Sequence, residues 1–210
     1  MALDHEEQEQ LAALKGWWEE HGNLVVAAIL AVAIGVGGWR GWNWYQNKQS
    51  LQASALYEML TRAVQASDAK TMRDASGALA ESYPRTLYAS LGALVAARYY
   101  FDHREPKDAK AQLEWVLERS RSDDLKDLAR LRLAAVLLDE KAYDQALKQL
   151  DAPHSDAYAA QYAALRGDVL VAKSQTKEAK AAYQVALDKA GKNDNAFRQS
   201  VRIRLEALGG

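Results

Sequence analysis

The chain has 210 residues, a formal net charge of −1 and no cysteine. The near-neutral charge gives no electrostatic argument for nucleic-acid binding, and the lack of cysteine excludes disulfides and thiolate zinc sites. Alanine, leucine and long polar residues dominate and only three prolines occur, which predicts an all-α protein.

The first 21 residues form a short acidic segment. Leu11, Leu14 and Trp18 fall at helical spacing, so this segment is either a short amphipathic helix on a membrane surface or a disordered tail. Lys15 is its one basic residue apart from histidine, whereas a cleaved signal peptide needs a basic start and a shorter apolar run. We therefore expect the apolar stretch that follows to be a retained anchor.

Residues 22–39 carry no charged side chain, and with His21 the gap between Glu20 and Arg40 is 19 residues. A helix of that length spans about 28 Å, close to the hydrocarbon core of a bilayer. Five of the six tryptophans flank it, where membrane-interface belts place them: Trp17, Trp18, Trp39, Trp42 and Trp44. The pattern favours a transmembrane helix with its aromatic flank, residues 22–45, over the core helix of a soluble protein.

Two glycines near the exit of this span are a candidate contact with another membrane helix. Gly37 and Gly41 have the small-xxx-small spacing that lets a second helix approach closely. The alternative is that they reflect only the general abundance of glycine in such helices.

The orientation of the span stays open on charge alone. Lys15 lies on one side, and Arg40 and Lys48 lie on the other. This count leans towards a cytoplasmic C-terminal domain, but the difference is too small to settle the topology.

Residues 46–210 show helical periodicity to the end. A first helix from Ser50 has an apolar face composed of Leu51, Ala55, Leu56, Met59, Leu60 and Ala63. A polar break at residues 67–68 leads to a second helix, which ends before Pro84.

An internal repeat organises the remainder of the chain. Ala97, Ala134 and Gly167 align as the small residue of a first helix, at spacings of 37 and 33 residues, close to the tetratricopeptide period. A second-helix alanine follows twelve residues later, and a large apolar residue four beyond it: Ala109 and Leu113, Ala146 and Leu150, Ala179 and Tyr183. Because two helices cross closely only at small residues, this pattern favours a tetratricopeptide-repeat-like α-solenoid over a generic alanine-rich bundle.

The predicted turns and the last helix agree with this division. Short polar turns fall at 101–106, 139–141 and 174–176, and longer connections at 151–156 and 191–195. Residues 197–208 form a final helix that would cap the solenoid. We expect Val201, Leu205 and Leu208 to face inward and Arg198, Arg202 and Arg204 to face outward.

The sequence offers no catalytic, cofactor-binding or metal-binding motif. The four histidines are scattered, and none has a carboxylate or a second histidine at ligand spacing on a common helix face. Phosphate-binding glycine loops and nucleophile elbows are absent. We therefore predict a protein that is not an enzyme and needs no cofactor.

With no catalytic motif in the sequence, the remaining hypothesis is a protein-binding surface. Tetratricopeptide arrays bind other proteins on the concave face made by their first helices. Residues one and four after each small position should point there: Arg98, Phe101, Ala135, Leu138, Asp168 and Val171. The alternative is that Phe101, Leu138 and Val171 contact the preceding hairpin or the terminal helix instead.

Three blocks of sequence resemble a known family. They are Gly38-Trp39-Arg40-Gly41-Trp42-Asn43 at the span exit, the run from Leu51 to Tyr57, and Leu165-Arg166-Gly167-Asp168 in the last repeat. With the acidic N-terminal segment and the single span, they make the chain similar to the YfgM family, ancillary subunits of the bacterial Sec translocon. The resemblance covers essentially the whole length.

This resemblance implies an inner-membrane protein with a cytoplasmic segment 1–21, the span 22–45 and a periplasmic tetratricopeptide-like domain 46–210. It implies association with the SecYEG translocon and a PpiD-like periplasmic chaperone, and contact with unfolded clients leaving the channel. The resemblance also gives the topology, which the charge count left open. This topology is opposite to the one that the charge count slightly favours. A different hypothesis is a scaffold that sequesters a stress-response or envelope-assembly factor, which would hold one folded protein through a few hot-spot residues.

Overall fold

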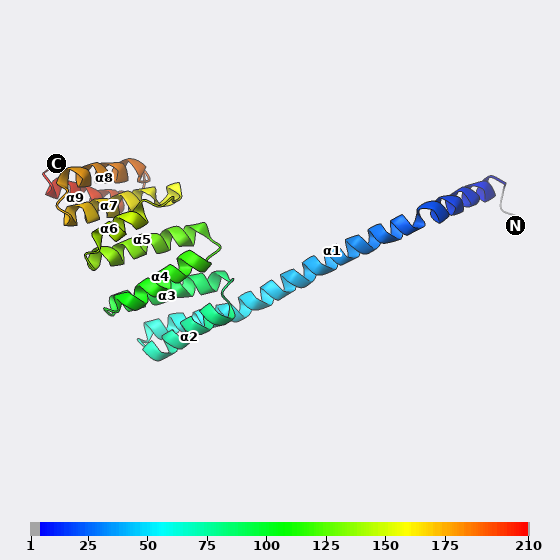
Figure 1. Cartoon of the computed structure of the whole chain (residues 1–210), viewed down its shortest axis with the longest axis horizontal. Helices are drawn as coiled ribbons and strands as arrows, with labels where there is room; N and C mark the ends of the chain where they lie inside the picture. The colour runs from blue at the N-terminus through cyan, green and yellow to red at the C-terminus, as the bar shows by residue number, and fades with distance from the viewer. Residues whose placement is uncertain (1–4, 210) are drawn as a thin grey trace. The chain divides into compact units, whose positions relative to one another are not determined.

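The structure, a computed structural model, describes residues 5–209, with side chains from Glu9 onward. The described residues form helices joined by short turns, with no strand among them, which confirms the predicted all-α fold (Figure 1). The elements are α1 (His5–Gln65), α2 (Ala69–Ser82), α3 (Leu87–Asp102), α4 (Pro106–Arg119), α5 (Asp123–Asp139), α6 (Tyr143–Leu150), the 3-10 turn η1 (Asp156–Tyr158), α7 (Ala159–Ala172), α8 (Thr176–Lys189) and α9 (Asn195–Ala207).

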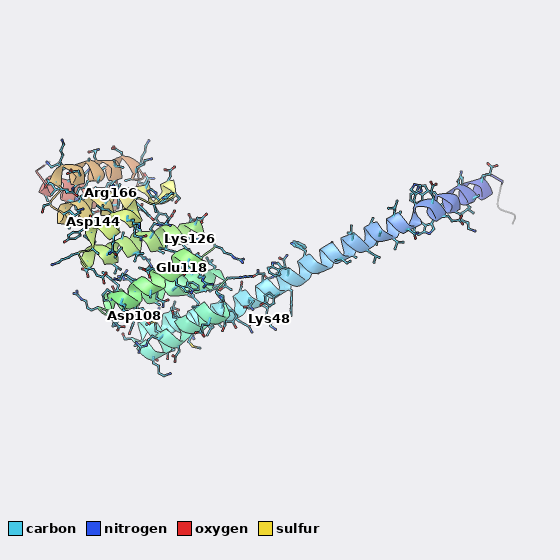
Figure 2. The ribbon with its side chains drawn as sticks, in the orientation of Figure 1. Lys48, Asp108, Glu118, Lys126, Asp144 and Arg166 are labelled. Atoms are coloured by element: carbon cyan, nitrogen blue, oxygen red, sulfur yellow. The ribbon has the colours of Figure 1, made fainter. Side chains whose placement is uncertain are left out.

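The chain divides into two units, residues 1–49 and 50–210. In the first, the described residues belong to α1, which is long and apolar enough to cross a membrane. Its aromatic side chains are exposed, and Lys48 Nζ lies 5.4 Å from the centroid of the Trp44 ring (Figure 2). Residues 1–4 of the predicted N-terminal segment lie outside the described residues. Residues 5–21 are helical and continue without a break into the apolar part of α1, so they do not form the separate short helix that was one of the two alternatives.

The second unit is a stack of helix hairpins, visible in Figure 1. Helices α3 and α4, α5 and α6, and α7 and α8 pack as antiparallel pairs, and α9 packs against α8. The small and large residues of the repeat are buried as the spacing predicted: Ala97, Ala109, Leu113, Ala134, Ala146, Leu150, Gly167, Ala179 and Tyr183. The unit therefore has the helical-repeat architecture that the sequence indicated.

Every hairpin reverses direction through the same local turn. Ser67, Arg104, Lys141 and Ser174 adopt left-handed backbone conformations, with φ of 55°, 65°, 62° and 61°. The N–H of the next residue donates to the carbonyl five residues before it, as Ala142 does to Leu137 at 2.8 Å. This is the Schellman pattern, which satisfies carbonyl groups left open at a helix end.

The shared turn shows that the first hairpin, the end of α1 with α2, is a fourth repeat. Seven residues before each left-handed residue lie Leu60, Ala97, Ala134 and Gly167. The sequence pattern missed this repeat because Leu60 occupies the small position and Met72 the alanine position, and both side chains are fully buried. Gly92 provides space nearby, since a Cβ there would lie 2.7 Å from Leu79 Cδ1.

The predicted apolar face of the first helix of this repeat is partly wrong. Leu51 and Met59 are 72% and 50% exposed, while Ala53, Leu60 and Ala63 are buried. The apolar residues of this helix cover a wider arc than one packed neighbour can bury, so part of the arc faces solvent.

The capping helix α9 also corrects one prediction. Val201 is fully buried and Leu205 and Leu208 are half-buried, as expected. Arg198, however, donates to the carbonyl oxygens of Leu187 and Ala190 at 2.7 and 3.3 Å, so it does not simply face outward. A guanidinium is stabilised there because the C-terminal end of a helix presents unpaired carbonyl groups and a partial negative charge.

Candidate partner-binding surface

The first helices of successive hairpins line one side of the second unit. Helix α3 contacts α5, and α5 contacts α7. We call the side that these helices line the inner face. The sequence predicts that it contains Arg98, Phe101, Ala135, Leu138, Asp168 and Val171.

A first hollow on the inner face lies between α3 and α5 and has a volume of about 230 Å³. It brings together three predicted residues, Arg98, Phe101 and Ala135. Leu113 and Val136, both buried, form its apolar base. A hollow of this size and lining fits a large apolar side chain of a partner.

A second hollow, of about 340 Å³, lies between α5, α7 and α9. It includes the predicted residues Ala135 and Asp168, together with Phe197 and Arg204 of the capping helix. Arg132 and Ala135 border both hollows, so the two adjoin along α5.

The two remaining predicted residues lie outside these hollows. Leu138 is half-buried and packs against the central core cluster. Val171 is 38% exposed and borders neither hollow.

Arg132 is the residue that the sequence prediction missed. Its guanidinium is partly buried and donates to the Leu94 carbonyl oxygen at 3.2 Å. The one carboxylate of the first hollow, Asp102, pairs instead with Arg98 at 2.8 Å. Burial lowers the pKa of Arg132, and the nearby charge of Arg98 lowers it further. Arg132 lies three residues, about one helical turn, before Ala135 on the same face of α5. A prediction extended by one turn towards the start of that helix would have included it.

Asp168 joins three helices. Its carboxylate accepts a hydrogen bond from Tyr183 Oη on α8 at 2.8 Å and pairs with Arg204 of α9 at 2.9 Å. Burial, and then the hydrogen bond to Asp168, raise the pKa of Tyr183. Arg204 was expected to face outward, but this ion pair ties it to α7.

These contacts give the block Leu165-Arg166-Gly167-Asp168 a structural meaning. Arg166 pairs with Asp151, which follows α6, and Figure 2 shows Arg166 and Asp144 on neighbouring helices. Asp144 pairs with Lys173 in the same way. A Cβ on Gly167 would lie 2.4 Å from the Tyr183 ring, so only glycine fits. The block therefore joins the last hairpin to its neighbours.

Gly37 and Gly41 lie in the first unit. A Cβ built on either would meet no heavy atom within 4 Å, so that face of α1 is open. Whether a second helix covers it stays a prediction.

Within residues 9–209 no group of three histidine, aspartate or glutamate side chains is placed to hold a metal ion. The two hollows of the inner face present apolar groups, three guanidinium groups and two paired carboxylates rather than an acid, a base and a nucleophile in mutual contact. This arrangement suits recognition of a protein surface.

Comparison with known proteins supports this description. A family model described as a tetratricopeptide repeat-like domain matches residues 15–210. A protein of Neisseria gonorrhoeae named ancillary SecYEG translocon subunit is 31% identical over 99% of this chain and 100% of its own length. Proteins of the same name are 31% identical in Haemophilus influenzae, over 89% of this chain and 91% of theirs, and 32% identical in Escherichia coli, over 89% and 90%.

Proposed function

The chain belongs to the tetratricopeptide repeat-like family of ancillary SecYEG translocon subunits, and from this membership we propose that it is a membrane-anchored, non-enzymatic adaptor of the translocon. The observation that carries the proposal is the extent of the likeness, since the match to the Neisseria gonorrhoeae relative includes both the apolar part of α1 and the hairpins. An anchor and a binding face in one chain suit a protein that holds a partner beside a membrane channel.

In this proposal residues 22–45 span the inner membrane, residues 1–21 face the cytoplasm and residues 46–210 form a periplasmic domain. The apolar length of α1 supports the anchor. The orientation rests on the family resemblance, because the charge count leans slightly the other way.

The inner face is the proposed site for a protein partner, either a PpiD-like periplasmic chaperone or clients leaving the channel. Its two adjoining hollows accept large apolar side chains. Arg132, which has no carboxylate partner among the described residues, would favour an acidic group beside them.

The test is recovery of the tagged full-length protein from its own membranes in mild detergent, followed by mass spectrometry. A span-only chain, residues 1–49, serves as the control. Recovery of SecY, SecE and SecG with a PpiD-like chaperone would support the proposal, and the control would show which unit holds them. Recovery of one unrelated soluble regulator without translocon subunits would favour the scaffold hypothesis instead.

Replacing Arg132 with glutamine should lower the recovery of the partner held by the inner face about tenfold, the effect of losing one hot-spot contact. The domain should stay folded, because the change loses only one hydrogen bond, to the Leu94 carbonyl, worth about 1–2 kcal/mol. The matched control is Arg202→Gln, which removes the same charge from an exposed position on α9. Equal recovery from both variants, measured by quantitative mass spectrometry, would contradict the role of the first hollow.

Replacing Gly37 and Gly41 together with leucine should reduce the recovery of membrane partners, because leucine side chains keep a second helix at a distance. The matched control is Ala28→Leu with Val32→Leu, which adds bulk at the same spacing elsewhere on α1. If recovery is unchanged in both, α1 serves only as a tether.

A further inference from the structure

A third hollow lies away from the inner face, where the turn between α2 and α3 meets the turn between α4 and α5. Both turns lie at the same edge of the hairpin stack (Figure 1), and the hollow between them has a volume of about 210 Å³. Arg85, Arg119 and Arg121 all line it. None of the three makes an ion pair within the described part of the chain.

The N-terminus of α3 forms the base of this hollow. Thr86 caps its first turn by accepting from the Ala89 N–H at 3.3 Å, and its own hydroxyl donates to the Tyr83 carbonyl oxygen at 2.8 Å. That turn contains no acidic residue to neutralise its partial positive charge. Ser90, which is 3% exposed, also lines the hollow. The corresponding turn of α5 does contain acids, Asp123 and Asp124, so the α3 side is the more electropositive.

These donors match one chemical group. Guanidinium groups bind phosphate oxygens through paired hydrogen bonds, and an uncompensated helix N-terminus favours the same anion. Carboxylates nearby leave the arginines free, because Asp123 pairs with Lys126 and Glu118 forms no ion pair with them. The rim adds an apolar side chain, since Leu87 lines the hollow and is 57% exposed. An exposed leucine beside several arginines is typical of contact with the headgroup region of a bilayer.

The α2–α3 turn of this hollow contacts the segment of chain that follows the span. Tyr83 Oη, in the α2–α3 turn, donates to Gln52 Oε1 at 3.4 Å. Gln52 follows the aromatic flank of the span, which ends at Tyr45, by seven residues. Seven residues reach at most about 25 Å even when fully extended. The α2–α3 turn is therefore held at a residue that at most about 25 Å of chain separates from the aromatic flank.

From these observations we infer that the hollow formed by Arg85, Arg119, Arg121, Thr86 and Ser90 binds the phosphate of an anionic phospholipid headgroup. The inference rests on the membrane anchor of the proposed function but not on any translocon partner. It gives the repeat domain a second attachment to the bilayer, on an edge separate from the inner face.

The experiment uses the full chain in lipid nanodiscs, either purely zwitterionic or containing phosphatidylglycerol, and measures amide hydrogen exchange. In the discs with phosphatidylglycerol we expect the amides of residues 82–90 and 119–125 to exchange at least about fivefold more slowly. This factor corresponds to the binding energy of one arginine at an anionic surface. The variant Arg85→Gln/Arg119→Gln/Arg121→Gln should lose this protection. The matched control Arg73→Gln/Lys107→Gln/Arg202→Gln removes as much charge from exposed positions outside the hollow and should keep it.

Equal exchange in both lipid compositions would overturn the inference, and so would a triple variant that responds like the wild type or a control variant that loses the protection too. The same protection in zwitterionic discs on addition of inorganic phosphate would also overturn it, because it would assign the site to a soluble anion. Leu87→Gln, at an exposed position, is a second variant that should weaken the lipid response without disturbing the fold. A chain that fails to enter the discs at all would contradict the anchor, which is a result distinct from a missing lipid response.

Discussion

Replacing Gly167 with alanine should lower the free energy of unfolding of the repeat domain by about 1–3 kcal/mol, as overpacking does in a filled core. The loss is expected although alanine is the better helix former by about 1 kcal/mol. An added Cβ would lie 2.4 Å from Tyr183 Cε1 and 2.6 Å from its Cδ1. Tyr183 is 2% exposed and its hydroxyl is bound by Asp168, so the ring cannot move aside without breaking that contact.

Gly77 provides the matched control, because it is an exposed glycine in the interior of α2 with open space around its Cα. Gly77→Ala should raise the free energy of unfolding by about 0.5–1 kcal/mol. Urea unfolding of the full chain in detergent, followed by circular dichroism, measures both variants.

Ala146→Leu should destabilise the domain as Gly167→Ala does, since Ala146 is fully buried at the other helix contact of the repeat. Unchanged midpoints for Gly167→Ala and Ala146→Leu would contradict the repeat phase.

Replacing Asp127 with alanine should destabilise the domain by about 1–3 kcal/mol, because it removes a buried carboxylate that two partly buried donors, the Ser155 N–H and the Arg130 guanidinium, use as an acceptor. Asp127 is 5% exposed and accepts from the Ser155 backbone N–H at 2.8 Å and from Arg130 at 3.3 Å. Arg130 also donates to the Pro153 carbonyl, so Asp127 and Arg130 together hold the connection between α6 and α7.

Two further variants test this explanation. Asp127→Asn should recover part of the loss, because an amide oxygen can still accept from Ser155. Asp151→Ala removes a carboxylate whose side chain is 57% exposed and should change the stability by no more than about 1 kcal/mol, although it breaks the ion pair with Arg166. Equal destabilisation by Asp127→Ala and Asp151→Ala in urea unfolding would show that burial does not decide the effect.

The sequence predicted the repeat well where the helix crossings use glycine or alanine, since those positions admit no larger residue. It failed at the first hairpin, where Leu60 and Met72 occupy the corresponding positions and both are fully buried. A search for small residues cannot detect a helix crossing that large residues fill. The common turn geometry, which depends on backbone conformation, identifies the repeat instead.

The candidate site was predictable in part for a similar reason. Helical phase alone gathers Arg98, Phe101 and Ala135 around the first hollow. Phase does not reveal that Asp168 is already bound, because its partners Tyr183 and Arg204 lie 15 and 36 residues further along the chain. Likewise, the three arginines of the third hollow come from two separate turns that only the folded stack brings together.

The short helix α6 gives the array a junction that depends on polar contacts. It has eight residues, of which Ala146 and Leu150 are buried, and the chain then runs through residues 151–158 to α7. In a linear array each hairpin is stabilised only by its neighbours, so opening begins where the contact area between neighbours is smallest. At α6 the contacts of Asp127, Arg166 and Lys173 across the junction hold the last hairpin in place. Loss of these contacts should therefore loosen the C-terminal hairpin, with the second hollow of the inner face, before the hairpins that follow the anchor.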